Sequence, residues 1–177
     1  MFLTLLICAL EILTNLSPAS AQYDGPPLPP PETTQLGYVD GKSYYYNDSQ
    51  IMDWQSASQF CQSFGWRLAE IRTQAQHDFF VAKSQNEGFI GQYWLGARDS
   101  STVGQYSWDG IDWSRDNRLK NFGQQILLYH QPQMCLLFES YDLGAGYKRS
   151  YWSTQPCVGS SAAILCENIP RINYYKF

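Results

Sequence analysis

Residues 152–157 read Trp-Ser-Thr-Gln-Pro-Cys, which places two hydroxyls and an amide between an aromatic side chain and a cysteine. These groups can hydrogen-bond a ligand. Ca²⁺ prefers about six to eight oxygen ligands, including carboxylates that offset its charge. Because no carboxylate stands between Trp152 and Cys157, the segment favours a structural or hydrogen-bonding role over a calcium site.

The cysteines predict disulfides. Cys8 lies in the N-terminal apolar segment, and four cysteines remain, namely Cys61, Cys135, Cys157 and Cys166. In an oxidising compartment this even set predicts two disulfides, whose pairing the spacing alone leaves open. A zinc site is disfavoured because no C-x-x-C spacing occurs. We expect no free thiol for nucleophilic catalysis.

The composition argues against an enzyme or a nucleic-acid-binding protein. Only two histidines occur, His77 and His130, and there is no G-x-S-x-G, phosphate loop or H-E-x-x-H. No acidic or basic tail predicts a nucleic-acid partner. Charged residues make up 16% of the chain and aromatic residues another 16%, which suits a loop-rich extracellular domain.

The N-terminal segments predict secretion. Residues 1–21 form an apolar run followed by Ala-Ser-Ala, the pattern of a cleaved signal peptide, although Glu11 interrupts the run. A short uncleaved anchor is the alternative. Residues 22–35 are proline-rich and predict an extended spacer. No later segment is long and apolar enough to span a membrane.

Two helices and several strands must position the chemistry. Helical spacing runs from Ile51 to Phe64 and turns Cys61 inward, with Gly65 as a left-handed cap. Thr73 and Gln76 form a capping box for a second helix, on which we expect His77 to be solvated. Strands are predicted at 37–46, 93–96, 105–108, 111–113, 136–138, 151–153 and 162–165. Residues between Trp113 and Cys135 form a long loop, which is typical of function or disorder.

Several motifs in fixed order closely resemble the C-type lectin-like domain. They are Trp54-x-x-Ala57-x-x-x-Cys61-x-x-x-Gly65-x-x-Leu68, then Tyr93-Trp94-Leu95-Gly96, then Trp108-x-Gly110, and finally Cys135, Trp152, Cys157 and Cys166. The resemblance implies an α+β C-type lectin-like fold over residues 36–169, followed by a C-terminal tail at 170–177. It implies two helices, two small antiparallel sheets, a long loop region and two disulfides.

The resemblance also assigns individual residues. It implies the short form of the domain, with disulfides Cys61–Cys166 and Cys135–Cys157. The fold motif residues it implies are Trp94, Gly96, Trp108 and Trp152.

The same resemblance bears on calcium. Sugar-binding members carry a Glu-Pro-Asn or Gln-Pro-Asp tripeptide and a Trp-Asn-Asp tripeptide that supply oxygens to Ca²⁺. Here Ser153 and Thr154 replace the Asn and Asp, and the loop tripeptide 131–133 is Gln-Pro-Gln. We therefore expect no metal and no other cofactor; calcium is possible but not expected. Glu139 and Asp142 could hold a different ion, but two acids on a strand and turn are more often solvated.

The candidate ligand surface follows the long loop and the strands after it. Its residues are Tyr129, His130, Gln131, Gln133, Glu139, Arg149, Tyr151, Ser153 and Thr154. Asn47 begins a sequon and is a glycosylation candidate. The alternative is that Asp48 or Ser49 caps the first helix and limits access to Asn47.

The leading hypothesis is a secreted module that binds an extracellular glycan or protein through the long loop, without calcium. One alternative is a calcium-dependent lectin with atypical ligands. The other is a structural extracellular-matrix protein that assembles through its proline-rich spacer and its C-terminal tail. The sequence does not fix the oligomeric state.

Overall fold

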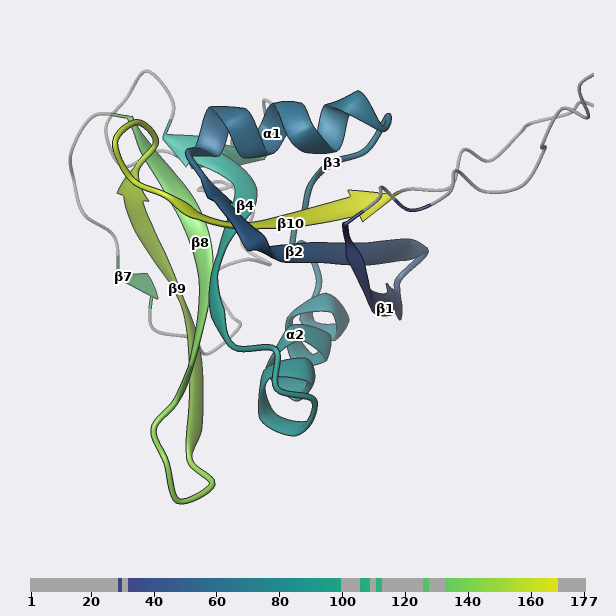
Figure 1. The fold of residues 1–177 in the computed structure, drawn as a ribbon, viewed down its shortest axis with the longest axis vertical. Coiled ribbons are helices and arrows are strands. Elements are labelled where there is room, and N and C mark those ends of the chain that lie inside the picture. Colours follow the sequence, from purple (N-terminus) through teal and green to yellow (C-terminus); the bar gives the residue numbers. More distant parts are fainter. Residues whose placement is uncertain are drawn as a thin grey trace, which may run out of the picture.

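The computed structural model describes residues 29, 32–99, 106–108, 111–112, 126–127 and 133–168. Two helices and ten strands follow one another along these residues (Figure 1). The helices are α1 (Trp54–Ser63) and α2 (Gln74–Asn86). The strands are β1 (Thr34–Val39), β2 (Lys42–Met52), β3 (Arg67–Leu68), β4 (Gly91–Asp99), β5 (Tyr106–Trp108), β6 (Ile111–Asp112), β7 (Ile126–Leu127), β8 (Met134–Asp142), β9 (Lys148–Pro156) and β10 (Ala162–Asn168).

The strands join into one mixed sheet in the order β1-β2-β10-β4-β8-β9-β7. Off this path, β3 pairs with β10, β5 pairs with β4, and β6 pairs with β5. The α+β class is confirmed, but the expected two antiparallel sheets are connected. The connection is a short parallel pairing in which Ala163 and Ile164 of β10 face Tyr93 and Trp94 of β4. Strand-like segments predict the strands, but not which distant strands pair.

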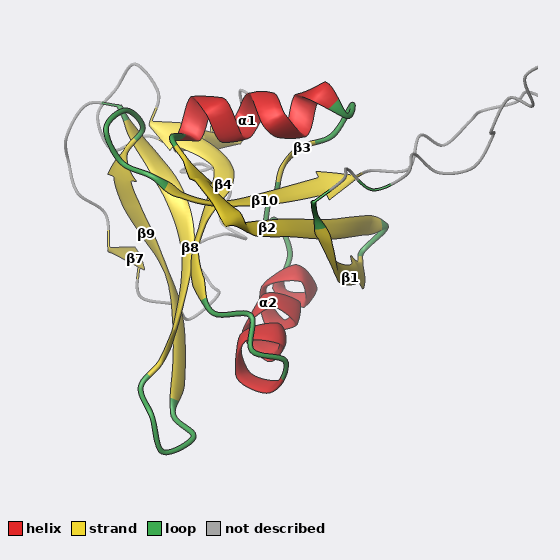
Figure 2. Ribbon diagram, in the orientation of Figure 1, coloured by secondary structure: helices red, strands yellow, loops and turns green. Residues whose placement is uncertain are grey.

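The sheet separates two hydrophobic clusters, because successive strand residues point to opposite faces. Tyr93 and Leu95 of β4 belong to the cluster that contains Phe80 of α2. Trp94, which lies between them, belongs to the cluster that contains Cys61 of α1. In Figure 2 the two helices accordingly lie on opposite sides of the strands β2 and β10.

Helix α1 begins at Trp54 because Asp53 caps it, its side chain accepting a hydrogen bond from the Ser56 amide at 2.8 Å. The suggested cap at Asp48 or Ser49 is wrong, since β2 continues to Met52. Cys61 faces the core as predicted. Gly65 follows the helix with a φ of 74°, the left-handed conformation expected after a helix end.

Helix α2 begins after Thr73, whose hydroxyl accepts a hydrogen bond from the Gln76 amide at 3.1 Å, one half of the predicted capping box. The Gln76 side-chain oxygen accepts from the Arg72 amide at 2.7 Å. The expectation that His77 is solvated is wrong, because only 4% of its surface is exposed. Its ring packs against Trp152 of β9, with ring centroids 6.3 Å apart. Burial lowers the pKa of His77, and the nearby charge of Asp78 partly opposes this shift.

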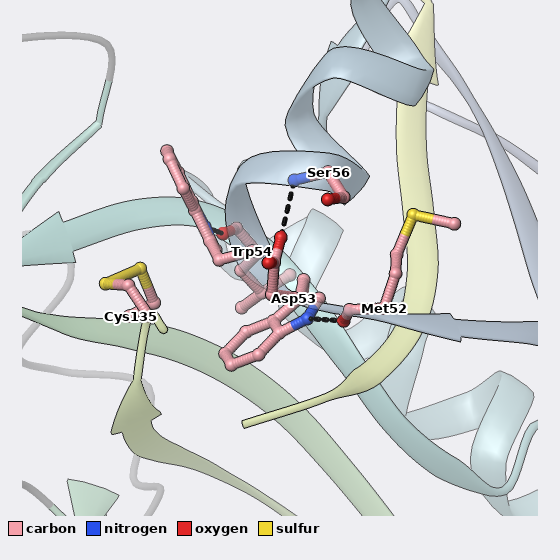
Figure 3. Close-up of a disulfide and its surroundings, with 8 residues drawn as sticks. Met52, Asp53, Trp54, Ser56 and Cys135 are labelled. Carbon is pink, nitrogen blue, oxygen red and sulfur yellow. Dashed lines mark hydrogen bonds between the residues drawn. A yellow bond between two sulfur atoms is a disulfide. The ribbon is translucent and has the colours of Figure 1, made fainter. Parts of the chain in front are cut away.

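Both disulfides form as the resemblance implies, Cys61–Cys166 and Cys135–Cys157. The first joins α1 to β10. The second closes the region between β8 and the end of β9. Figure 3 shows the Cys135 disulfide with Met52 and Trp54, which pack partly buried against the same cluster as Cys135.

Two hydrogen bonds from indole nitrogens to backbone carbonyls join the segment where β2 ends and α1 begins to β4. The indole nitrogen of Trp94 donates to the Met52 carbonyl at 2.8 Å, and that of Trp54 donates to the Leu95 carbonyl at the same distance (Figure 3). Because buried indole groups need a partner, these bonds fix α1 against β4. Among the described residues, neither helix is long and apolar enough to cross a membrane.

Candidate functional site

The structure divides the predicted ligand residues into separate groups. Tyr129, His130 and Gln131 lie outside the described residues. Gln133 is exposed just before β8, and its carbonyl accepts a hydrogen bond from the Cys157 amide at 2.8 Å. The remaining candidates lie on the two strands of the β8–β9 hairpin, which pair in antiparallel register from Met134 opposite Pro156 to Asp142 opposite Lys148.

Ser153 and Thr154 do not form a surface, which corrects that expectation. Only 5% of Ser153 and 1% of Thr154 are exposed. As neighbours on β9 they point to opposite faces of the sheet. Ser153 donates to the Glu139 carboxylate of β8, whereas Thr154 hydrogen-bonds the Tyr106 hydroxyl. The two hydroxyls therefore do not converge on one point.

Glu139 is buried rather than solvated, with 4% of its surface exposed. Its two carboxylate oxygens accept hydrogen bonds from the Ser153 and Tyr141 hydroxyls and, at 3.2 Å, from the Gln92 amide of β4. Gln92 also donates to the Tyr141 hydroxyl at 3.0 Å. A buried carboxylate needs such donors to offset the loss of water, and this network links three neighbouring strands.

An aromatic row lies next to Glu139 on the hairpin. The rings of Tyr141 and Tyr151 stack with centroids 5.8 Å apart and planes 22° from parallel. The Arg149 guanidinium lies over Tyr151 at 5.8 Å from the ring centre, within cation–π range. Burial raises the pKa of both tyrosines, and the bond to Glu139 raises that of Tyr141 further. Both phenols are therefore neutral and can donate hydrogen bonds at physiological pH.

The calcium site of the sugar-binding relatives does not fit the residues seen here. In residues 32–99, 133–168 and the short described pieces between them, no three His, Cys, Asp or Glu side chains are placed to hold a metal ion. Asp142 is exposed and accepts a hydrogen bond from the Gly144 amide at 2.9 Å. Glu139 already accepts hydrogen bonds from Ser153, Tyr141 and Gln92, which it would have to give up in order to coordinate Ca²⁺.

The predicted fold motif residues are buried as expected of structural positions. Trp94, Trp108 and Trp152 are among the largest fully buried side chains. Gly96 allows a close approach, since a Cβ there would lie 2.9 Å from the Leu68 carbonyl oxygen. Trp152, next to Ser153, therefore anchors β9 in the core.

Asn47 is the glycosylation candidate, and it is 98% covered in the fold, with 2% of its surface exposed. Its side-chain oxygen accepts hydrogen bonds from the Ser49 amide, the Ser49 hydroxyl and the Gln50 amide, at 3.0, 2.8 and 3.0 Å. Its amide nitrogen, the atom to which a glycan would be joined, is buried. This geometry argues against the predicted modification.

Sequence reasoning missed Gln92 and Tyr141, which complete the network around Glu139. Gln92 precedes the predicted strand 93–96 by one residue and faces Glu139 in the register of β4 and β8. Tyr141 follows Glu139 by two residues, so the two share one face of β8. That period-two pattern was the available signal, but the pairing of Gln92 with Glu139 depends on sheet order.

Comparison with known proteins identifies the fold. The family profile described as the lectin C-type domain matches residues 50–168. The mouse protein C-type lectin domain family 4 member F is 26% identical over 131 residues, which are 73% of this chain and 22% of that protein. The chain thus spans about a fifth of the length of this relative.

Two further comparisons also find C-type lectins. The mosquito protein C-type lectin mosGCTL-7 of Aedes aegypti is 25% identical over 130 residues, covering 70% of this chain and 82% of the relative. The structure of the Ca²⁺-independent C-type lectin SPL-2 from Saxidomus purpuratus superposes with a TM-score of 0.56 at 19% identity, over 80% of this chain and 94% of that one. With a family profile that covers most of the folded region, the chain belongs to the C-type lectin domain family.

Proposed function

We propose that this chain is a secreted, non-enzymatic recognition module that binds an extracellular carbohydrate or protein ligand through its long loop, residues 114–134, without calcium. Family membership supports a recognition role. It leaves open which ligand is bound, because the mammalian relatives are several times longer than this chain.

The proposal that binding does not need calcium rests mainly on one observation, the hydrogen bond from the Ser153 hydroxyl to the buried Glu139 carboxylate. A divalent cation here would have to break this bond and recruit further carboxylates to repay its own dehydration. The fold alone does not decide calcium use, since similar structures include both the Ca²⁺-independent lectin SPL-2 and a Ca²⁺-dependent type II antifreeze protein.

A binding screen tests the proposal. The secreted full chain is applied to arrays of glycans and extracellular proteins, once with excess EDTA and once with millimolar CaCl₂. We expect the same ligands in both conditions. Binding that EDTA abolishes and calcium restores would show that the calcium assignment is wrong.

Loop variants then test where the ligand binds. Tyr129→Ala and His130→Ala change the long loop, and Tyr147→Ala is the matched control because Tyr147 is 74% exposed at the hairpin tip. We expect the loop variants to weaken binding and the control to bind as the unmodified chain does. Deletion of residues 22–35 or of residues 171–177 tests the alternative of a structural extracellular-matrix protein. A deletion that changes self-assembly of the chain but leaves ligand binding unchanged would favour this alternative.

A further inference from the structure

A groove of about 560 Å³ lies where the beginnings of β4 and β10 meet the end of β2 and Tyr141 of β8. Pockets that hold small ligands have volumes of about 300–1,000 Å³. The groove therefore has room for a small ligand or for one residue of a larger one. All of its lining residues lie in the described part of the chain.

The lining combines apolar surface with hydrogen-bonding groups. Ile51 is 59% exposed at the rim, and Ile90 and Ala162 add apolar surface. Asp48 and Ser161 are exposed and offer a carboxylate and a hydroxyl. A ligand that matches this lining needs one apolar face and several neutral hydrogen-bonding groups.

Two lining side chains are held in place by the Glu139 network. The Gln92 amide donates to the Glu139 carboxylate at 3.2 Å and to the Tyr141 hydroxyl at 3.0 Å. The Tyr141 hydroxyl donates to Glu139. With its amide nitrogen committed in this way, Gln92 can offer its amide oxygen to a ligand. Tyr141 is also fixed by its stack on Tyr151, so both groups are ordered before a ligand arrives.

We propose that this groove is a second, calcium-free subsite that binds a neutral pyranose residue of a glycan. The apolar face of the sugar ring packs on Tyr141, and its hydroxyls reach Gln92, Asp48 and Ser161. The inference rests on the proposed function and adds a site outside the long loop.

The groove chemistry selects this ligand class over others. An apolar peptide side chain would cover the Gln92 amide oxygen and the Ser161 hydroxyl without offering either a hydrogen bond, which is costly. An acidic sugar would place its carboxylate near the exposed Asp48, and like charges repel. A neutral sugar satisfies both the aromatic and the polar lining.

Nuclear magnetic resonance titration tests the subsite in the presence of EDTA. The probes are the methyl pyranosides of glucose, galactose, mannose and N-acetylglucosamine, added to the isotope-labelled full chain. We expect at least one of them to shift the resonances of the Gln92 side-chain amide and of the Ala162 and Ala163 backbone amides. Shifts confined to other residues, or no shifts with any probe at tens of millimolar, would overturn the proposal.

Variants make the test specific. Tyr141→Ala removes the stacking face, and Gln92→Leu removes the amide while keeping a similar volume. We expect each to weaken the binding of the active pyranoside about tenfold, as loss of one aromatic or hydrogen-bonding contact would. The control Tyr147→Ala removes an exposed tyrosine from the same hairpin and should leave binding within about twofold. Thermal unfolding checks that each variant is folded.

The outcomes separate this inference from the proposed function. Unchanged affinity in folded Gln92→Leu and Tyr141→Ala overturns the groove, while lost binding in the Tyr129→Ala and His130→Ala variants would still support the long loop. A pyranoside that binds the groove only when calcium is added overturns the calcium-free subsite. Loss of binding in the groove variants alone supports the groove and contradicts the long loop as the ligand site.

Discussion

Replacement of Ser153 by alanine tests the hydrogen bond to Glu139 on which the proposed calcium independence rests. The Ser153 hydroxyl donates to Glu139, and only 5% and 4% of these residues are exposed. Without Ser153 the carboxylate keeps Tyr141 and Gln92 as donors to one oxygen but loses the Ser153 donor to the other. Hydrogen bonds to charged groups contribute about 1.5–3 kcal/mol. We therefore expect Ser153→Ala to lower the free energy of unfolding by about 2 kcal/mol.

Urea unfolding in EDTA, followed by tryptophan fluorescence, measures this change. The control Ser161→Ala removes a hydroxyl from an exposed position before β10 and should change the free energy by no more than about 0.5 kcal/mol. Tyr141→Phe removes a second donor to the same carboxylate. Since both hydroxyls share one acceptor, the double variant should deviate from additivity by about 0.5 kcal/mol or more. A Ser153→Ala protein as stable as the Ser161→Ala control would refute the reasoning.

Three further predictions follow from buried positions. Gly96→Ala should lower the free energy of unfolding by about 1–3 kcal/mol, since the new Cβ would lie 2.9 Å from the Leu68 carbonyl oxygen; urea unfolding that matches the unmodified chain contradicts this. Because the pKa of His77 is lowered in the folded chain, the unfolded chain binds a proton at this histidine more readily than the folded chain does. The stability that neutral His77 contributes is therefore present above about pH 6.5 and is lost as the pH falls below that value. His77→Gln should therefore reduce the change of the unfolding free energy with pH between about pH 5 and 7. The same pH dependence in the variant and the unmodified chain would show that His77 does not cause it. Asn47 should remain unmodified in protein secreted from animal cells, because its amide is buried; a glycosidase-sensitive mass at this residue would show otherwise.

Local sequence signals predicted both helices and most of the longer strands, but the strand predicted at 37–46 is divided by a turn at residues 40–41 into β1 and β2. Thr73 and Gly65 mark a helix start and a helix end because caps are local backbone features. Resemblance to a family added the disulfide pairing, which spacing alone left open. These features depend on neighbours in sequence or on motifs in fixed order.

Burial was harder to predict than secondary structure. Helix α2 carries apolar residues around its circumference, including Ala75 and Phe79, so its sequence pattern does not select one inner face. Packing on the sheet selects the face with His77 and Phe80. The burial of Glu139 likewise depends on donors that other strands supply, and strand order cannot be read from one strand's sequence.

Two residues of the predicted ligand surface were misjudged for the same reason. Ser153 and Thr154 look like exposed hydroxyls in the sequence, but each is buried against a different face of the sheet. The sequence identified Arg149 and Tyr151, and the structure places them beside Tyr141 in one aromatic row. That row and the groove at its end became visible only once β4, β8 and β10 were placed together.

The melting temperature of the full chain, measured in EDTA and again in CaCl₂, tests calcium independence most directly. A ligand that binds only the folded state adds about 2.7 kcal/mol of stability at about 100 times its dissociation constant. We predict the same melting temperature in EDTA and in millimolar CaCl₂. A melting temperature that rises with calcium concentration, and does not rise with MgCl₂ at equal ionic strength, would contradict the account.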